Sequence, residues 1–593
     1  MNRLHNNFSG IPLVLLLALV LLQGAGCSSR EQLPSQEIRN VGVIETITQH
    51  CRDDIGPPRV EQVSEHVWVA IGYDLANTEL IHTEEGNVIV DTSQCPAAAR
   101  AIKKAFAESA PPGPVRAIIY THTHIDHVGG TSAWMEPGTR IWAEENFVGN
   151  FVKQYGTFMQ AEKARGYRQF GYHLSREDLP CSAIGPVLKS YTLEELAETG
   201  TIMPTDTFAG MKPLEIGGLT IELHTAPGET DDTLFVWIPA DNTLLCADDY
   251  YSAFPNLYTI RGSRPRPTDG WINSLDDMRR LQPEHLVPSH TSVVNGSTRI
   301  EEILTNYRDA IQWVRDEVIR RANAGQDIDT IAENIKLPPQ LAQLPYLWEG
   351  YGQVSWSARA IYTNNEGWFD GRADKLYPLN HDELARREVE LMGGPEKLAG
   401  LAGKAVADGD PQWAVHLLAK LKDSGLASGD TAANLDSLLA TAYRQIADNT
   451  SNTNGRAYLL ESALELDKAR PPDFPGKIDP GLVAGLPVDL IFTNLQPRLI
   501  PDKARGVYES VCFIFPDVSR QFTVTVRNGV AEIAEGQPLP GTPAPVAVVT
   551  TDSLTYKMMA LKLADTAAMV QQGKINLEGS WPAFLIFMGR FQT

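Results

Sequence analysis

Apolar residues between positions 60 and 294 occur in short runs rich in β-branched side chains, separated by turns and by segments with helical spacing. Clear examples are residues 88–91 (VIVD), 117–120 (AIIY) and 234–238 (LFVWI). Short apolar strands that alternate with helices are typical of a mixed α/β fold. The pattern therefore predicts an α/β domain over residues 59–300.

The pattern changes twice after this domain. Segments such as residues 300–324 and 435–446 have helical spacing with few strand-like runs between them, which predicts an all-α domain over residues 301–470. Strand-like runs then return, and Asn528-Gly529 is a dipeptide favoured in tight hairpin turns, so we expect an α+β domain over residues 480–593. Its many apolar residues indicate either an ordinary core or a pocket for a lipid or alkyl chain.

The N-terminus has the features of an export signal. An apolar run at residues 11–22 follows Arg3 and is too short to span a bilayer, as in the h-region of a signal peptide. Small residues precede Cys27 in an arrangement like a bacterial lipobox, although the usual Leu three positions before the Cys is absent. We expect a signal peptide over residues 1–26, a polar tether over residues 27–58, and an exported protein in the periplasm or on the outer membrane of a bacterium. The membrane tether would be a lipidated Cys27, and the alternative is ordinary cleavage with a soluble product.

The composition narrows the choice of partners. Hydrophobic residues make up 43% and charged residues 21% of the chain, as in an ordinary globular protein. The formal net charge of -22 opposes binding to phosphate backbones, so we expect no nucleic-acid partner. The six cysteines form no C-x-x-C pair, which argues against a zinc ribbon. A single bridge, for which Cys51 and Cys95 are candidates, would fit an oxidising compartment.

Four side chains that bind metals lie within six positions, directly after a strand-like run. They are His122, His124, Asp126 and His127. Two histidines two positions apart on a loop can converge on one cation, while Asp126 and His127 face a second position. A buried, hydrogen-bonded core histidine is an ordinary explanation for one such residue but a poor one for the whole group.

This spacing resembles the signature of the metallo-β-lactamase superfamily, and later positions match that family in order. Glu229 stands where many members have their third histidine, Asp248 follows an apolar strand at the position of the bridging carboxylate, and His290 matches the last ligand. Asp249 is the rival of Asp248, and Asp91 matches an early aspartate that supports the site. The resemblance implies an αββα fold with two Zn²⁺ ions per chain. A carboxylate at position 229 would also admit Mn²⁺ or Fe.

Within the superfamily, the chain resembles the alkyl sulfatases that degrade dodecyl sulfate. Three features carry the resemblance: Glu229 in place of the third histidine, the segment at 255–262 (PNLYTIRG) and the segment at 367–371 (GWFDG). That family implies a homodimer formed through the all-α domain, a sterol-carrier-like C-terminal domain, and an amphiphilic sulfate ester as substrate.

The same resemblance implies a sulfate pocket. Arg261 and Asn256 are the candidates, because a guanidinium offers a planar fork to two sulfate oxygens and an amide adds a neutral donor. A structural salt bridge is the alternative role for Arg261. Tyr172 is a further candidate for substrate binding, where family members have a Tyr-x-Tyr-Gly segment and this chain does not.

The predicted reaction is hydrolysis of an alkyl sulfate ester to alcohol and inorganic sulfate by metal-activated water. Asp126, Asp248 and Arg261 would form the catalytic set. Cleavage of the C–O bond and of the S–O bond remain alternatives. The first rival is another hydrolase on the same metal core, such as a lactonase, thioesterase or β-lactamase. The second is a lipid-binding scaffold with a vestigial metal site, against which the filled ligand positions argue.

Overall fold

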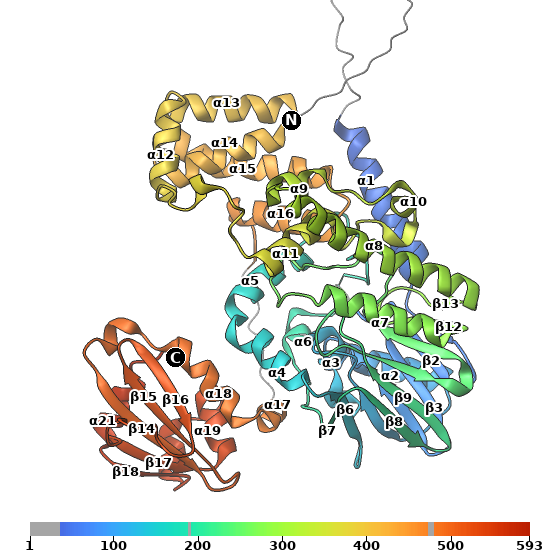
Figure 1. The fold of residues 1–593 in the computed structure, drawn as a ribbon, viewed down its shortest axis with the longest axis vertical. Helices are drawn as coiled ribbons and strands as arrows, with labels where there is room; N and C mark the ends of the chain where they lie inside the picture. The colour runs from blue at the N-terminus through green and yellow to red at the C-terminus, as the bar shows by residue number, and fades with distance from the viewer. Residues whose placement is uncertain (1–35, 188–190, 472–479, 593) are drawn as a thin grey trace, which may run out of the picture.

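The computed structural model describes residues 36–187, 191–471 and 480–592 (Figure 1). The predicted signal peptide over residues 1–26 and Cys27 lie outside these residues. Among the helices of the described residues, none is long and apolar enough to cross a membrane.

Two mixed sheets form the core of the N-terminal α/β domain. The first has seven strands in the order β1 to β7, antiparallel from β1 to β4 and parallel from β4 to β7. The second has six strands in the order β13-β12-β11-β10-β9-β8, of which only the pair β11 and β12 is parallel. The strands are β1 (Arg59–Gln62), β2 (Val67–Ile71), β3 (Thr78–Thr83), β4 (Gly86–Val90), β5 (Val115–Ile119), β6 (Arg140–Glu144), β7 (Asp206–Phe208), β8 (Met211–Ile216), β9 (Leu219–Thr225), β10 (Leu234–Ile238), β11 (Thr243–Ala247), β12 (His285–Pro288) and β13 (Val294–Asn295).

The alternation of side chains along each strand produces a layered structure. In β5, Ala117 and Ile119 pack between the sheets, whereas Ile118 packs with Ile102 and Phe106 of α2 (Pro96–Ser109). Helices cover the outer face of the second sheet as well, which confirms the expected αββα fold. The remaining helices near the strand ends are α3 (Ile125–Val128), α4 (Phe147–Val152), α5 (Met159–Phe170) and α6 (Leu193–Ala197).

The α/β core extends beyond the predicted boundary at residue 300. Helix α8 (Ser297–Asn323) places Leu304 and Ile311 in one buried cluster with Trp271 of α7 (Thr268–Leu281) and Leu286 of β12. Helix α11 (Val354–Glu366) adds Ile361 to the same cluster. Helical spacing predicted α8 correctly, but it could not show that the helix packs on the sheet of the preceding domain.

The middle of the chain is helical, as expected. Its helices are α9 (Ile328–Asn334), α10 (Pro339–Ala342), α12 (His381–Leu391), α13 (Pro395–Asp408), α14 (Pro411–Ser424), α15 (Gly429–Asp448) and α16 (Thr453–Leu466). Helices α12 to α15 share a core of their own that includes Leu398, Leu418 and Leu439. In Figure 1 this group lies apart from the two sheets, while α16 packs on α5.

The C-terminal domain is a five-stranded sheet with helices, in the order β16-β15-β14-β17-β18. The rings of Phe492, Phe513, Phe522 and Tyr556 pack against one another in its interior, so these aromatic side chains fill it as an ordinary core. Leu482 packs into the α/β core and connects the two domains. The elements are α17 (Pro480–Gly485), α18 (Val488–Leu495), β14 (Tyr508–Phe515), β15 (Arg520–Arg527), β16 (Val530–Glu535), β17 (Ala547–Thr551), α19 (Ser553–Ala560), α20 (Thr566–Gln571), β18 (Ile575–Gly579) and α21 (Trp581–Met588).

The described part of the predicted tether is folded, which corrects the expectation for residues 36–58. Helix α1 (Gln36–His50) continues into a π-helical segment, Cys51–Ile55, and Ile47 and Ile55 are buried against the rest of the molecule. Cys51 forms a disulfide with Cys181. The suggested partner Cys95 was wrong, because Cys95 is a buried free thiol at the start of α2.

Candidate metal centre

The candidate ligands converge at one end of the two sheets. His122 and His124 lie on the loop after β5, and α3 carries Asp126 and His127. Glu229 lies between β9 and β10, Asp248 directly follows β11, and His290 follows β12. All seven side chains are buried or nearly so, so the strand ends bring together every residue that the sequence proposed as a ligand.

Tight backbone turns position the side chains of Asp248 and His290. Ala247, directly before Asp248, has φ 54°, and Thr291, directly after His290, has φ 66°. Left-handed φ is unfavourable for residues other than glycine and persists where the surrounding structure enforces it, often at functional sites.

The first group of donor atoms belongs to His122, His124 and Asp248, whose ligand atoms lie within 4.8 Å of one another. His122 Nε2 and His124 Nδ1 are 2.9 Å apart, and Glu229 Oε1 lies 3.7 Å from His124 Nδ1. The second group contains Asp126, His127 and His290 within the same limit of 4.8 Å.

Asp248 lies between the two groups. Its Oδ1 is 3.6 Å from His127 Nε2, and its Oδ2 is 3.2 Å from His290 Nε2 and 3.7 Å from His122 Nε2. The rival Asp249 instead accepts a hydrogen bond from the Glu229 backbone N–H at 3.3 Å. The geometry therefore places Asp248, rather than Asp249, where a carboxylate could bridge two cations.

Hydrogen bonds behind the ligands orient their rings. His127 Nδ1 lies 2.6 Å from Asp91 Oδ2, and His290 Nδ1 lies 2.8 Å from the Leu75 carbonyl oxygen. Both Nε2 atoms face inward and, within the described structure, have no hydrogen-bond partner; the same is true of Asp248 Oδ1. Buried polar atoms rarely lack partners, and imidazole nitrogens with oriented second nitrogens are the usual ligands of zinc and similar ions. The residues thus fit a divalent metal centre.

The electrostatics of the cluster point the same way. Burial would raise the pKa of Asp126, but the His127 imidazole outweighs it and brings the pKa to about 2. Burial opposes protonation of His127, yet Asp248, Asp126 and Asp91 raise its pKa well above the usual range. This concentration of carboxylates favours a positive charge at the centre of the site. A divalent cation would provide it and release the protons.

Arg261 reaches this centre. Its Nη2 donates to His124 Nε2 at 3.0 Å, its backbone N–H donates to Gln169 Oε1 at 2.8 Å, and its side chain is 14% exposed. Asn256 precedes Arg261 by five residues and is buried. Its backbone N–H donates to the Tyr251 hydroxyl. Tyr172 instead lies in the wall of an apolar cavity, where its hydroxyl accepts a hydrogen bond from Gln94.

Arg266 was missed by the sequence reasoning. Its guanidinium donates to Glu229 Oε2, and both side chains are almost fully buried. Burial raises the pKa of Glu229 to about 7, and Arg266 opposes that rise. The only signal in the sequence is a third arginine in the segment 261–266 (RGSRPR), which does not show which of the three turns inward.

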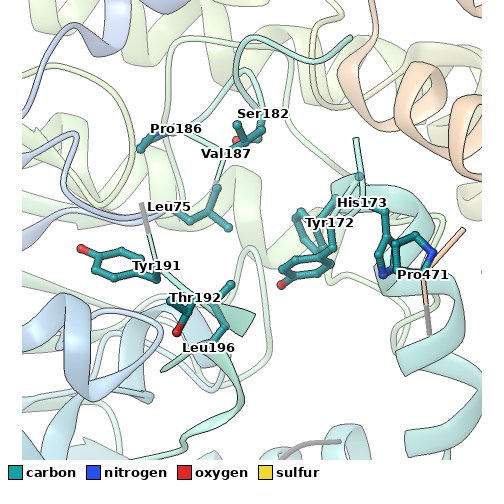
Figure 2. A pocket seen from close by; sticks show the side chains of 12 residues that line it. Leu75, Tyr172, His173, Ser182, Pro186, Val187, Tyr191, Thr192, Leu196 and Pro471 are labelled. Carbon is teal, nitrogen blue, oxygen red and sulfur yellow. The ribbon is translucent and has the colours of Figure 1, made fainter. Parts of the chain in front are cut away.

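An open cavity of about 360 Å³ lies beside Leu75, and none of the seven candidate ligands lines it (Figure 2). Its lining is mainly apolar and aromatic, and Figure 2 shows Leu75 between Tyr172 and Tyr191. Leu75 connects the cavity to the centre because its carbonyl oxygen holds His290. The other lining residues include Phe170, Val187 and Leu196.

Comparisons with known proteins agree with this fold. The sequence matches the family model of the metallo-beta-lactamase superfamily over residues 71–290, of the alkyl sulfatase dimerisation domain over residues 327–469, and of the alkyl sulfatase C-terminal domain over residues 477–593. It is 33% identical over 480 residues to a linear primary-alkylsulfatase from a Pseudomonas species, which covers 77% of this chain and 88% of the relative.

Two further relatives span more of the chain. An (R)-specific secondary-alkylsulfatase from Pseudomonas is 28% identical over 533 residues, covering 87% of this chain and 78% of the relative. The solved structure of a stereoselective inverting sec-alkylsulfatase from Pseudomonas superposes with a TM-score of 0.82 at 24% identity, over 92% of this chain and 86% of that chain, and shares the fold.

The αββα layers and the two donor groups at the strand ends define a metal-dependent hydrolase of the metallo-β-lactamase superfamily. Within that superfamily, the three matching family models and the primary-alkylsulfatase relative show that the chain belongs to the alkyl sulfatase family.

Proposed function

We propose that the protein hydrolyses alkyl sulfate esters to an alcohol and inorganic sulfate at this centre. The observation that carries the proposal is the pair of buried donor groups that share Asp248, with the Arg261 guanidinium against His124. The first feature supports hydrolysis, and the second supports an anionic substrate.

The residues divide the chemistry between them. Two divalent ions held by the seven candidate ligands would supply a hydrolytic nucleophile from water near neutral pH. Asp126 and Asp248 fix the charge and spacing of the centre, and Arg261 binds sulfate oxygens through its planar fork. Without Arg261, the sulfate monoanion would approach a site rich in carboxylates.

The apolar cavity supports an alkyl substituent on the ester. Each methylene that it takes out of water contributes about 0.8 kcal/mol to binding. The chain would enter beside Leu75 and Val187, so that the ester end lies near His290.

The finer assignments are part of the proposal. We assign Zn²⁺ to both positions because four of the seven ligands are histidines, although Glu229 also suits Mn²⁺ or Fe. A homodimer is supported by the match to the dimerisation domain. The predicted signal sequence and the Cys51–Cys181 disulfide support an exported protein in an oxidising compartment, and Cys27 is the proposed lipidated tether.

One assay tests the proposal. Sulfate release from dodecyl sulfate is measured by ion chromatography for the purified protein, after chelation, and after re-addition of Zn²⁺ or Mn²⁺, with His127→Ala as the matched inactive control. Release that chelation stops and metal restores is expected. Turnover of a lactone, thioester or β-lactam but not of dodecyl sulfate would favour another hydrolase. Fewer than about one bound metal per chain after reloading would favour a lipid-binding scaffold.

A further inference from the structure

The side chain of Arg266 lies behind the carboxylate that replaces an imidazole in the first donor group. Its Nη1 donates to Glu229 Oε2, and the exposed fractions are 3% for the Arg266 side chain and 5% for that of Glu229. The other oxygen, Oε1, faces His124 Nδ1 at 3.7 Å. The carboxylate therefore has one oxygen on the guanidinium and one directed at the metal centre.

Packing alone does not explain a buried arginine here. Arg266 Nε is inaccessible to solvent and has no hydrogen-bond partner among the described residues. A buried guanidinium with an unsatisfied N–H lowers the stability of the fold, and replacement of such ion pairs by apolar residues is often neutral or stabilising. The role of the Arg266 guanidinium is therefore to be sought in its ion pair with the Glu229 carboxylate.

The charge balance of the centre gives the reason. With Glu229, the two donor groups contain three carboxylates, whereas an imidazole at position 229 would leave the two of Asp126 and Asp248. An additional anionic ligand weakens the pull of a divalent ion on the electrons of its other ligands. A guanidinium on the outer oxygen cancels that additional charge.

We infer that Arg266 is a positioning residue that neutralises Glu229, so that the pair acts toward the metal as one neutral, single-oxygen ligand in place of a histidine. This inference rests on the proposed metal-dependent hydrolysis. If the inference is right, replacement of Glu229 by His is tolerated only when Arg266 is replaced by a neutral residue as well.

Metal affinity and turnover separate this role from a structural one. In Arg266→Gln, an uncompensated and mobile carboxylate should bind the metal about tenfold more tightly, while kcat falls about a hundredfold. If Arg266 only held the loop in place, its replacement would instead weaken metal binding. In Glu229→His with Arg266 retained, the unpaired guanidinium should weaken metal binding at least about tenfold.

The double variant Glu229→His/Arg266→Gln provides the decisive test. We expect it to regain metal affinity within about threefold of the parent and most of the kcat lost in Arg266→Gln. Affinity is measured by competition with a chromogenic chelator, and the visible spectrum of the Co²⁺ form reports coordination by one or two carboxylate oxygens. Arg308→Gln, which removes the α8 arginine that pairs with Asp276 of α7, is the matched control.

Each outcome decides the question. Weaker metal binding in Arg266→Gln, or no recovery in the double variant, overturns the inference. If Arg266→Gln does not fold, Arg266→Lys keeps the charge and should retain parental affinity within about threefold; a larger change overturns the inference. Absence of sulfate-ester turnover in the metal-loaded parent would instead overturn the proposed function. The metal affinities of the variants are measured without substrate, so they test the inference separately.

Discussion

Replacement of Arg261 by Ala separates the sulfate pocket from the metal centre. The side chain is 14% exposed and donates to His124 Nε2, so a bound sulfate would meet a largely desolvated guanidinium. Each charge-assisted hydrogen bond that is lost costs about 1.5–3 kcal/mol. Loss of a two-pronged contact should therefore lower kcat/KM for dodecyl sulfate by about a thousandfold. Arg261→Lys keeps the charge without the fork and should lose about tenfold.

The assay compares two substrates on the same protein. Sulfate release from dodecyl sulfate is measured beside hydrolysis of a neutral carboxylic ester of the same chain length, and bound metal is counted in each variant. The ester rate should change less than about threefold, because a neutral ester has no oxyanion for Arg261 to hold before attack. An equal loss on both substrates would refute the sulfate role. A parallel loss of metal would show that Arg261 acts through His124 instead.

Three other perturbations test other parts of the molecule. Replacement of both Cys51 and Cys181 by Ser should lower the free energy of unfolding by up to about 5 kcal/mol in denaturant titrations, because the bridge closes a separation of 130 residues; a difference below about 1 kcal/mol would contradict this. The pKa of Glu162 is raised by burial from 4.5 to about 7, and its carboxylate lies 3.8 Å from Arg261. It is therefore neutral below that pH and competes with sulfate above it, so KM should rise about threefold from pH 6 to pH 8 in the parent but stay flat in Glu162→Gln. Finally, kcat/KM should rise about fourfold per methylene from hexyl to decyl sulfate, and Val187→Asp should abolish this gradient while short esters are still hydrolysed.

The convergence of the candidate ligands could be predicted from the sequence because each follows a strand whose apolar pattern is local, whereas the roles of Glu229, Asp248 and His290 came from the family resemblance. An apolar run that ends in a histidine or carboxylate places that side chain at the edge of a sheet, and parallel strands bring such edges together. Asp248 and His290 follow adjacent parallel strands, β11 and β12. Asp248 was preferred to Asp249 because it is the first acid after the apolar strand and keeps the family spacing, and the structure places it between the two donor groups.

The parts that the sequence did not predict depend on contacts between distant residues. Arg266 pairs with Glu229 across 37 positions, and Cys51 pairs with Cys181 across 130. Neither pair has a local pattern. Helix α8 was predicted as a helix, but its spacing is the same whether it packs on a sheet or on other helices.

The N-terminal segment shows most clearly how a polar stretch can serve the site. Residues 36–58 were expected to be part of a polar tether, yet Asp54 contacts the loops that follow two of the candidate ligands. Its carboxylate accepts a hydrogen bond from Ser252 at 2.5 Å, four residues after Asp248, and its carbonyl oxygen accepts one from Ser292 at 2.8 Å, two residues after His290. Hydrophobic patterning detects elements that are held mainly by apolar burial, whereas this segment combines the burial of Ile47 and Ile55 with a disulfide and polar contacts. Part of its stabilisation comes from the loops of the centre, so the order of those loops and the order of the segment depend on each other.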